Sequence, residues 1–325
     1  MRWNIPKPFY YFSAGITVVG GAYLLKDYIT GPLYTCNEDL TGKVVIVTGS
    51  NTGIGKEIAS ELANLKAKVI MACRDMEKCE MARQQIVLAT KNKYVYCREC
   101  DLASQESIKK FVDQFKKEHS KLHILINNAG VMRCPKSYTK EGIEMQLGVN
   151  HIGHFLLTNL LLDVIKDSAP SRIINVSSRS HKHGKIKLKD LNSDEYYDPG
   201  QAYAQSKLAN VLFTRELAKR LEGTGVTVNA VHPGIVHTDI VRHMSIYHNF
   251  ITKAFTEIVM WLFMKPPKKG AQTVIYAALE PSLKDVTGAY FSNYKVADIS
   301  DEAKNDDIAK WLWAVSEKWT RLNHI

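Results

Sequence analysis

The chain has 325 residues, of which 45% are hydrophobic and 23% charged, an ordinary globular composition without low-complexity tracts. The net charge of +10 would suit an anionic partner, but the sequence has no zinc finger, RNA-binding aromatic signature or dense basic run, which excludes nucleic acid. Six cysteines are too few for a disulfide scaffold, so we expect reduced thiols, including the Cys97 and Cys100 pair.

The N-terminal segment is unusually apolar. Residues 9–25 carry no charge, and a helix that spans a bilayer needs about 20 apolar residues, with a lower limit of about 17. We therefore interpret residues 1–30 as an uncleaved membrane anchor and residues 31–40 as a linker. A helix packed on the protein and a cleaved signal peptide are the alternatives, although no cleavage site is obvious before Lys26.

The remaining residues, 41–325, alternate short β-branched runs with longer helical stretches. We expect strands at 44–48, 68–72, 94–97, 124–126, 173–176 and 226–231. We expect helices at 55–65, 77–89, 105–118 and 153–165. This alternation predicts a parallel sheet covered on both faces, the doubly wound (Rossmann) α/β architecture, in a single domain. Ligands of this architecture bind at the carboxyl ends of the strands.

The first expected strand runs into a glycine-rich turn, TGSNTGIG, at residues 48–55. Glycines there permit a tight turn and let the backbone approach a pyrophosphate. The helix that follows offers free N–H groups and a positive dipole end to a phosphate. The turn therefore predicts a dinucleotide bound by Gly49, Ser50, Asn51, Thr52, Gly53, Ile54 and Gly55.

The second expected strand ends in Cys73 and Arg74, followed by Asp75. A site selective for NAD places a carboxylate at this strand end, where it binds the ribose 2′-hydroxyl. A guanidinium instead makes fork-like hydrogen bonds to a 2′-phosphate. We therefore predict NADPH or NADP held by Arg74. NADH is the alternative if Asp75 reaches the ribose.

Further motifs follow in a fixed order: Asp101-Leu102, NNAG at 127–130, Asn150, the serine pair Ser177-Ser178, Tyr203-x-x-x-Lys207 and Pro233-Gly234. With this ordered set, the chain resembles the short-chain dehydrogenase/reductase family over nearly all of residues 40–280. The segments ACRDMEKCE, NNAGVMRCP, GVNHIGHFLLTNLLL and QSKLANVLFT resemble the membrane-associated retinol dehydrogenases within that family.

Tyr203 and Lys207 are four residues apart, so on a helix their side chains share one face, and a nearby ammonium favours the phenolate. The resemblance implies that Tyr203 is the acid in carbonyl reduction and the base in alcohol oxidation. It implies that Lys207 also binds the nicotinamide ribose, and that Asn150 holds Lys207 through a water. It assigns the hydrogen bond to the substrate oxygen to Ser178, with Ser177 as the competing choice.

The resemblance also implies further cofactor contacts. Asp101, beside Leu102, would contact the adenine. Asn128, Ala129 and Gly130 would line the adenosine ribose. The nicotinamide and the pyrophosphate would be supported by Pro233, Gly234, Ile235 and Thr238.

The region after the Pro-Gly motif, about residues 237–267, is rich in bulky apolar side chains, and we expect it to form a substrate lid. Such a lining suits a lipophilic, elongated substrate. The resemblance implies all-trans-retinal and retinol, with another lipophilic carbonyl, such as a lipid aldehyde or a steroid, as the alternative. A nucleotide-binding interaction protein with little turnover is a third hypothesis, against which the intact catalytic set argues.

Location and assembly follow only from the resemblance. One branch of the group implies the mitochondrial inner membrane, and its sister enzymes imply the endoplasmic reticulum. The family is often dimeric or tetrameric, which leaves a homo-oligomer open.

Several other features are interpreted as structural. We expect no metal site, because His151 and His154 have no third ligand at zinc spacing. His181 and His183 should lie in a loop near the substrate mouth. Residues 308–319 present one apolar helical face, for which core packing is the default and membrane contact the alternative.

Overall fold

A computed structural model describes residues 7–236, 238, 261 and 264–322. Its described strands form one sheet in the order β3-β2-β1-β4-β5-β6-β7-β8. Neighbouring strands are parallel, except for the antiparallel β7–β8 pair. The strands are β1 (Val44–Thr48), β2 (Lys68–Cys73), β3 (Val95–Glu99), β4 (Ile124–Asn127), β5 (Ser171–Val176), β6 (Val226–His232), β7 (Tyr290–Ser292) and β8 (Lys295–Val296).

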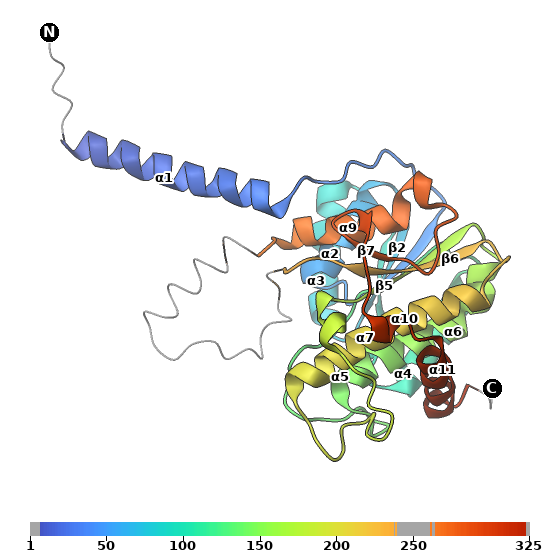
Figure 1. Cartoon of the computed structure of the whole chain (residues 1–325). Helices are drawn as coiled ribbons and strands as arrows, with labels where there is room; N and C mark the ends of the chain where they lie inside the picture. Colours follow the sequence, from blue (N-terminus) through green and yellow to red (C-terminus); the bar gives the residue numbers. More distant parts are fainter. Residues whose placement is uncertain (1–6, 237, 239–260, 262–263, 323–325) are drawn as a thin grey trace, which may run out of the picture.

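Helices cover both faces of the sheet (Figure 1). One face packs against α2 (Gly53–Asn64), α3 (Met76–Thr90) and α9 (Pro267–Leu279). The other packs against α4 (Gln105–Glu118), α6 (Gly153–Lys166) and α7 (Pro199–Arg220). Successive side chains of a strand point to opposite faces, so Val45 and Val47 join the first core and Val44 and Ile46 the second. The predicted doubly wound α/β fold is confirmed.

The strand order reverses between β1 and β4, which lie side by side at the centre of the sheet. A crevice opens outside the carboxyl ends of the strands at such a reversal, and this is where doubly wound folds bind ligands. The expected strands and helices agree with the observed ones to within about two residues, the usual uncertainty of element ends. The short strands β7 and β8 were not predicted.

Shorter elements complete the fold. Around the crevice lie α5 (Met145–Leu147), the π-helix η1 (Gly148–Ile152) and the 3₁₀ turn η2 (Arg179–His183). Toward the C-terminus come η4 (Pro281–Leu283), α10 (Asp301–Lys304) and α11 (Asp306–Thr320).

Helix α1 (Lys7–Thr30) reaches away from the body of the molecule (Figure 1). Among the described residues, no helix combines the length and apolarity needed to cross a membrane. The helix is tied to α9 by an ion pair in which Lys269 Nζ lies 2.5 Å from Asp27 Oδ1. The segment predicted as a linker also docks on this part of the chain, because the Tyr34 N–H donates to Gln272 Oε1 and the Tyr34 hydroxyl donates to Glu280.

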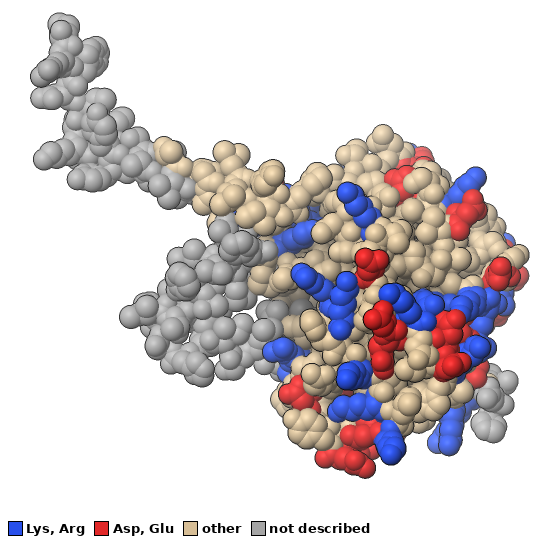
Figure 2. Space-filling model, in the orientation of Figure 1, with Lys and Arg blue, Asp and Glu red and all other residues tan. Residues whose placement is uncertain are grey.

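The surface carries charges of both signs, interspersed over the face of the body seen in Figure 2. The described part of α1 is much poorer in charge on that face (Figure 2). Several large apolar side chains near the end of α1 are exposed, including Leu24 at 75% and Tyr28 at 86% of their surface. The body of the molecule therefore presents a charged surface, whereas the end of α1 presents an apolar one.

The cysteines depart from the expectation of reduced thiols. Cys79 on α3 and Cys97 on β3 form a disulfide, with their Cα atoms 6.0 Å apart. The expectation is wrong for this pair, because the fold places α3 directly against β3, an adjacency that spacing along the chain does not reveal. Cys100, the other half of the CxxC pair, is a free and buried thiol.

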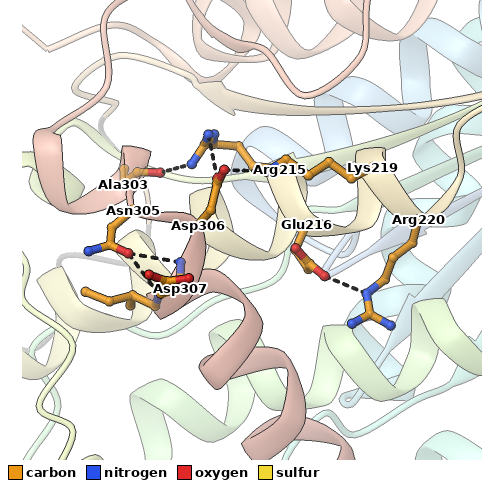
Figure 3. Close-up of polar contacts among 9 residues, drawn as sticks. Arg215, Glu216, Lys219, Arg220, Ala303, Asn305, Asp306 and Asp307 are labelled. Carbon is orange, nitrogen blue, oxygen red and sulfur yellow. Dashed lines mark hydrogen bonds and ion pairs between the residues drawn. The ribbon is translucent and has the colours of Figure 1, made fainter.

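The C-terminal helices pack against α7. Leu312 of α11 is buried in a shared core, so core packing is confirmed for the apolar face predicted at residues 308–319. Figure 3 shows the polar rim of this contact: Arg215 donates to Ala303 O at 2.7 Å and to Asp306 Oδ1 at 3.0 Å, and Lys219 pairs with the same carboxylate. Helix α7 is thus held by both apolar and polar contacts with the C-terminal helices.

Candidate active site

The turn between β1 and α2 brings backbone to the floor of the crevice. Gly49 and Gly53 have φ angles of +63° and +56°, a conformation that favours glycine. A Cβ on Gly55 would collide with the carbonyl oxygen of Gly49 and with the side-chain amide of Asn128. That amide donates to Thr48 O at 2.9 Å, which holds the loop after β4 against the turn. The result is a backbone cradle at the N-terminus of α2, a shape that suits a pyrophosphate.

A cavity of about 1100 Å³ runs along the carboxyl ends of the strands. It brings together most of the predicted site residues: Gly49, Asn51, Thr52, Gly53, Ile54, Gly55, Arg74, Asp101, Leu102, Asn128, Ala129, Gly130, Ser178, Tyr203, Lys207, Pro233, Gly234, Ile235 and Thr238. Ser50 and Asn150 are not on its surface. Ser50 is fully buried, and its hydroxyl donates to Val47 O at 2.9 Å, so its side chain shapes the turn from below.

Tyr203 and Lys207 lie on α7 and face the cavity together. Lys207 Nζ is 5.8 Å from the centre of the Tyr203 ring and donates to Val176 O at 3.0 Å. Burial raises the pKa of Tyr203 to about 12, while a hydrogen bond with Ser178 opposes that rise. Burial lowers the pKa of Lys207 to about 8. The expected lowering of the phenol pKa is therefore outweighed by burial, and Tyr203 is a neutral proton donor near pH 7.

The two serines after β5 point to different places. Ser177 also borders the cavity, but it is buried, and its hydroxyl is already engaged because it donates to the backbone oxygen of Lys207 at 2.8 Å. Ser178 lines the cavity, where its hydroxyl caps η2 by accepting from Ser180 N at 3.1 Å. Because Ser178 also hydrogen-bonds Tyr203, the geometry favours Ser178 over Ser177 as the group that meets a substrate oxygen.

The comparison with known proteins decides the family. Residues 43–246 match the family model described as short chain dehydrogenase. The chain is a short-chain dehydrogenase/reductase. This dehydrogenase/reductase is 50% identical to retinol dehydrogenase 13 of Homo sapiens over 311 residues, 95% of this chain and 94% of that one. It is 48% identical to retinol dehydrogenase 11 of Mus musculus over 292 residues, 90% of each chain. The predicted resemblance is confirmed, and the protein is an oxidoreductase acting on CH–OH groups.

Solved structures share the fold. A putative uncharacterized protein from Mycobacterium paratuberculosis is 35% identical, with a TM-score of 0.72, and covers 89% of this chain and 98% of its own. The RhlG/NADP complex of Pseudomonas aeruginosa is 26% identical, with a TM-score of 0.62, and covers 78% of this chain and 95% of its own. Short-chain dehydrogenases bind NAD or NADP, the class of cofactor that the glycine turn predicts.

Charged side chains of both signs follow the end of β2, and they have different partners. Asp75 caps α3, because its Oδ1 accepts from Lys78 N at 3.0 Å. Its Oδ2 lies 3.3 Å from Lys78 Nζ, and the backbone hydrogen bond lowers the pKa of the carboxyl. Arg74 and Lys78 both line the cavity, and Arg74 is exposed. The carboxylate is thus engaged by the first turn of its own helix, and Asp75 lines the cavity together with the two cations.

Asn150 lies in the π-helix η1, behind the cavity wall. Its Oδ1 accepts from Val131 N at 2.8 Å, and its Nδ2 donates to Val131 O and to Ser206 Oγ, both at 2.9 Å. The side chain thereby joins the strand-end loop after β4 to the helix that carries Tyr203 and Lys207. Single π-turns often mark functional sites in helices. A water between Asn150 and Lys207 stays a prediction.

The segment after β6 is described only in part. Gly234 has a φ of +93°, and Ile235 is exposed over 65% of its surface at the cavity rim. Lys265 N donates to Ile235 O at 2.8 Å, which closes the base of the predicted lid. Most of that lid, residues 237–267, lies outside the described residues.

Some cavity residues were missed by sequence reasoning: Lys78, Val131, Met132, Val149, Arg179, Ser180, His232 and Val236, whereas Met264 lies within the expected lid. His183, expected near the substrate mouth, is on the cavity surface, whereas His181 is fully buried. The sequence could have indicated Lys78, because it lies four residues after Arg74, in the first turn of the helix expected at 77–89. The others come from loops whose direction depends on the packing of the whole fold.

Proposed function

We propose that this enzyme uses NADPH to interconvert a lipophilic carbonyl and its alcohol, with all-trans-retinal and retinol as the substrate pair. One observation carries the proposal. Tyr203, Ser178 and Lys207 face the same cavity that the glycine cradle at Gly49–Gly55 borders. A carbonyl held beside the phenol would therefore lie in reach of a dinucleotide on the cradle.

The residues present fit NADPH. The absence of a Cβ at Gly55 lets α2 pack directly against the Gly49 carbonyl, which holds the turn in the shape that borders the cavity. Arg74 and Lys78 supply two cations, and a guanidinium binds phosphate oxygens through paired hydrogen bonds. The engagement of Asp75 as a helix cap supports NADPH over NADH, because the carboxylate is already bonded to Lys78 N.

The bound nicotinamide supplies the hydride in the reductive direction. Tyr203 donates its phenolic proton to the carbonyl oxygen, which becomes the alcohol oxygen. The Ser178 hydroxyl donates a hydrogen bond to the same oxygen and stabilises the negative charge that develops there. Asn150 takes part as a bracing residue, through its bonds to Val131 and Ser206. In alcohol oxidation, Tyr203 takes the proton back as the base.

A lipophilic substrate is supported by apolar side chains in the cavity lining. Met264, Val236 and Ile235 line the same cavity as Tyr203, and apolar walls bind elongated apolar ligands. About half of the sequence is identical to retinol dehydrogenases 13 and 12 of Homo sapiens. Lipid aldehydes and steroids share the required chemistry, so they form the alternative substrate classes.

We also propose that the N-terminal segment brings the enzyme to a membrane, where lipophilic substrates partition. Exposed apolar side chains near the end of α1, such as Leu24 and Tyr28, support this. The mitochondrial inner membrane is the proposed compartment, and the endoplasmic reticulum is the alternative. Imaging of a C-terminally tagged chain distinguishes them, and a diffuse signal would count against both.

The test of the activity is a carbonyl panel assayed with NADPH and NADH in parallel. Purified full-length protein in mild detergent should oxidise NADPH with all-trans-retinal faster than with any steroid or saturated aldehyde of equal length. Faster turnover of another carbonyl would replace the substrate and keep the chemistry. Cofactor binding without turnover on the whole panel would overturn the proposed function.

A further inference from the structure

Two buried histidines on neighbouring turns have different partners. His151 lies in η1 and His154 at the start of α6, and both are almost fully buried. His151 Nε2 lies 3.0 Å from Ser316 Oγ in the C-terminal helix α11. His154 Nε2 lies 2.9 Å from Thr48 Oγ1, and its Nδ1 lies 3.1 Å from Asn150 O. His151 therefore contacts the C-terminal helix, whereas His154 lies between Thr48 and Asn150, which belong to two elements of the site.

The hydrogen positions on His154 follow from what its partners can do. A carbonyl oxygen only accepts, so Nδ1 must carry the proton that is donated to Asn150 O. Nε2 is then a bare acceptor. Thr48 Oγ1 already accepts from Asn128 N at 2.9 Å and from Ala129 N at 3.0 Å, which uses both of its lone pairs.

The remaining group on Thr48 is its hydroxyl hydrogen, which has two acceptors within reach. Ile126 O lies at 3.4 Å, and His154 Nε2 lies at 2.9 Å, so the shorter and stronger bond is to the imidazole. Both ends of the ring thus require the same tautomer. Burial lowers the pKa of His154 to about 4, which keeps the ring in this neutral form.

The bonds continue beyond the ring into the catalytic helix. Asn150 Nδ2 donates to Ser206 Oγ at 2.9 Å, and Ser206 Oγ donates to the backbone oxygen of Tyr203 at 2.8 Å. At the other end, Thr48 supports the backbone of Asn128 and Ala129, which line the cavity beside the glycine cradle. His154 is the link between these two halves of a buried network.

We propose that His154 is a positioning residue for the cofactor, because it sets the Thr48 hydroxyl that holds the Asn128–Ala129 backbone in place. The inference rests on the proposed binding of NADPH. Without the imidazole, the Thr48 hydrogen has only the poorly placed Ile126 O, and a buried donor without a good partner favours rearrangement. A shift of Thr48 moves the cavity wall that the cofactor contacts.

His151 offers a matched control within the same chain. It is also a buried histidine bonded to one hydroxyl, but that hydroxyl belongs to α11 and is remote from the cavity wall. We compare His154→Leu with His151→Leu, and His154→Gln with His151→Gln, in the full-length protein. The readouts are the thermal midpoint without cofactor and the NADPH Kd from the change in cofactor fluorescence.

Both leucine variants should lower the thermal midpoint, whereas only His154→Leu should raise the NADPH Kd, by about ten-fold for one lost buried hydrogen bond. His154→Gln retains an acceptor for Thr48 and should recover much of the affinity. Equal Kd values in His154→Leu and wild type, or an equal rise in His151→Leu, would overturn the inference. If His154→Leu does not fold, His154→Asn gives the decision, because its shorter side chain can keep the bond to Asn150 O but has no acceptor at the Nε2 position, so it should also raise the NADPH Kd. Failure of wild type itself to bind NADPH would instead refute the proposed cofactor.

Discussion

The two ends of the cavity are built from different parts of the chain. At the cofactor end, backbone forms the surface, through the turn at Gly49–Gly55 and the loop that Thr48 and Asn128 hold against it. At the other end, side chains form the reactive surface, with Tyr203 reaching in from α7 and Ser178 from the turn between β5 and η2. Backbone determines which ligand shape fits, whereas side chains supply the proton and the hydrogen bonds. Substitutions at the first end should change affinity, and those at the second should change turnover.

The largest expected effect is at the side-chain end. Tyr203→Phe removes the proton donor and keeps the ring, so kcat for carbonyl reduction should fall by about 10²–10⁴-fold, the usual contribution of a general acid. The NADPH Kd should stay close to that of wild type, which fluorescence titration of the same preparation checks. Residual activity near the wild-type rate would assign the proton to another group. A matching loss of NADPH affinity would break the division between the two ends.

The next largest effect is expected at the cofactor end, where we propose that Arg74 selects NADPH over NADH. Arg74→Ala should raise the NADPH Kd by about 10- to 100-fold, because a hydrogen bond to a charged group contributes about 1.5–3 kcal/mol. The NADH Kd should not change, since NADH has no 2′-phosphate. Lys117→Ala, which removes an exposed cation on α4, controls for the general loss of positive charge. Equal weakening of both cofactors would show that Arg74 acts on the shared part of the dinucleotide.

The backbone cradle itself is tested by one added methyl group. Gly55→Ala places a Cβ against Gly49 O and the Asn128 amide, and overpacking of this kind typically costs about 1–3 kcal/mol. We expect weaker NADPH binding by about ten-fold and a lower thermal midpoint. Gly20→Ala is the control, because a Cβ there meets nothing within 4 Å. If Gly55→Ala binds NADPH as wild type does, the cradle is not where the pyrophosphate lies.

The cofactor end was the more predictable from sequence, because its constraints are local. Glycines mark positions where backbone must turn or approach closely, and the β-branched run at Val44–Thr48 marks a buried strand. The role of Asp75 as a helix cap also had a local signal, since aspartate directly before a helix is a common N-cap.

The side-chain end was less predictable, because its properties depend on packing. The spacing of Tyr203 and Lys207 predicted a shared face, but burial outweighs the ammonium in setting the phenol pKa. The choice between Ser177 and Ser178 depended on how β5 ends against α7. The Cys79–Cys97 disulfide and the link through His154 likewise join segments that only the fold brings together.

The smallest expected effect is a pH dependence confined to the side-chain end. Burial lowers the pKa of Lys207 from 10.5 to about 8 and raises that of Tyr203 to about 12. Between pH 7 and pH 9 the phenol therefore keeps its proton, while the ammonium loses its own. If the charged form is required, kcat/KM for carbonyl reduction should fall by about ten-fold over this interval, as the protonated fraction of Lys207 falls.

Lys207→Arg gives the deciding profile. A guanidinium stays protonated throughout this interval, so the variant should be slower than wild type at pH 7 but nearly flat up to pH 9. The sign is specific, because a titrating base would make reduction fall toward low pH instead. A decline that persists unchanged in Lys207→Arg would assign it to a different group. The side-chain end would then owe its pH response to something other than the buried amine beside Tyr203.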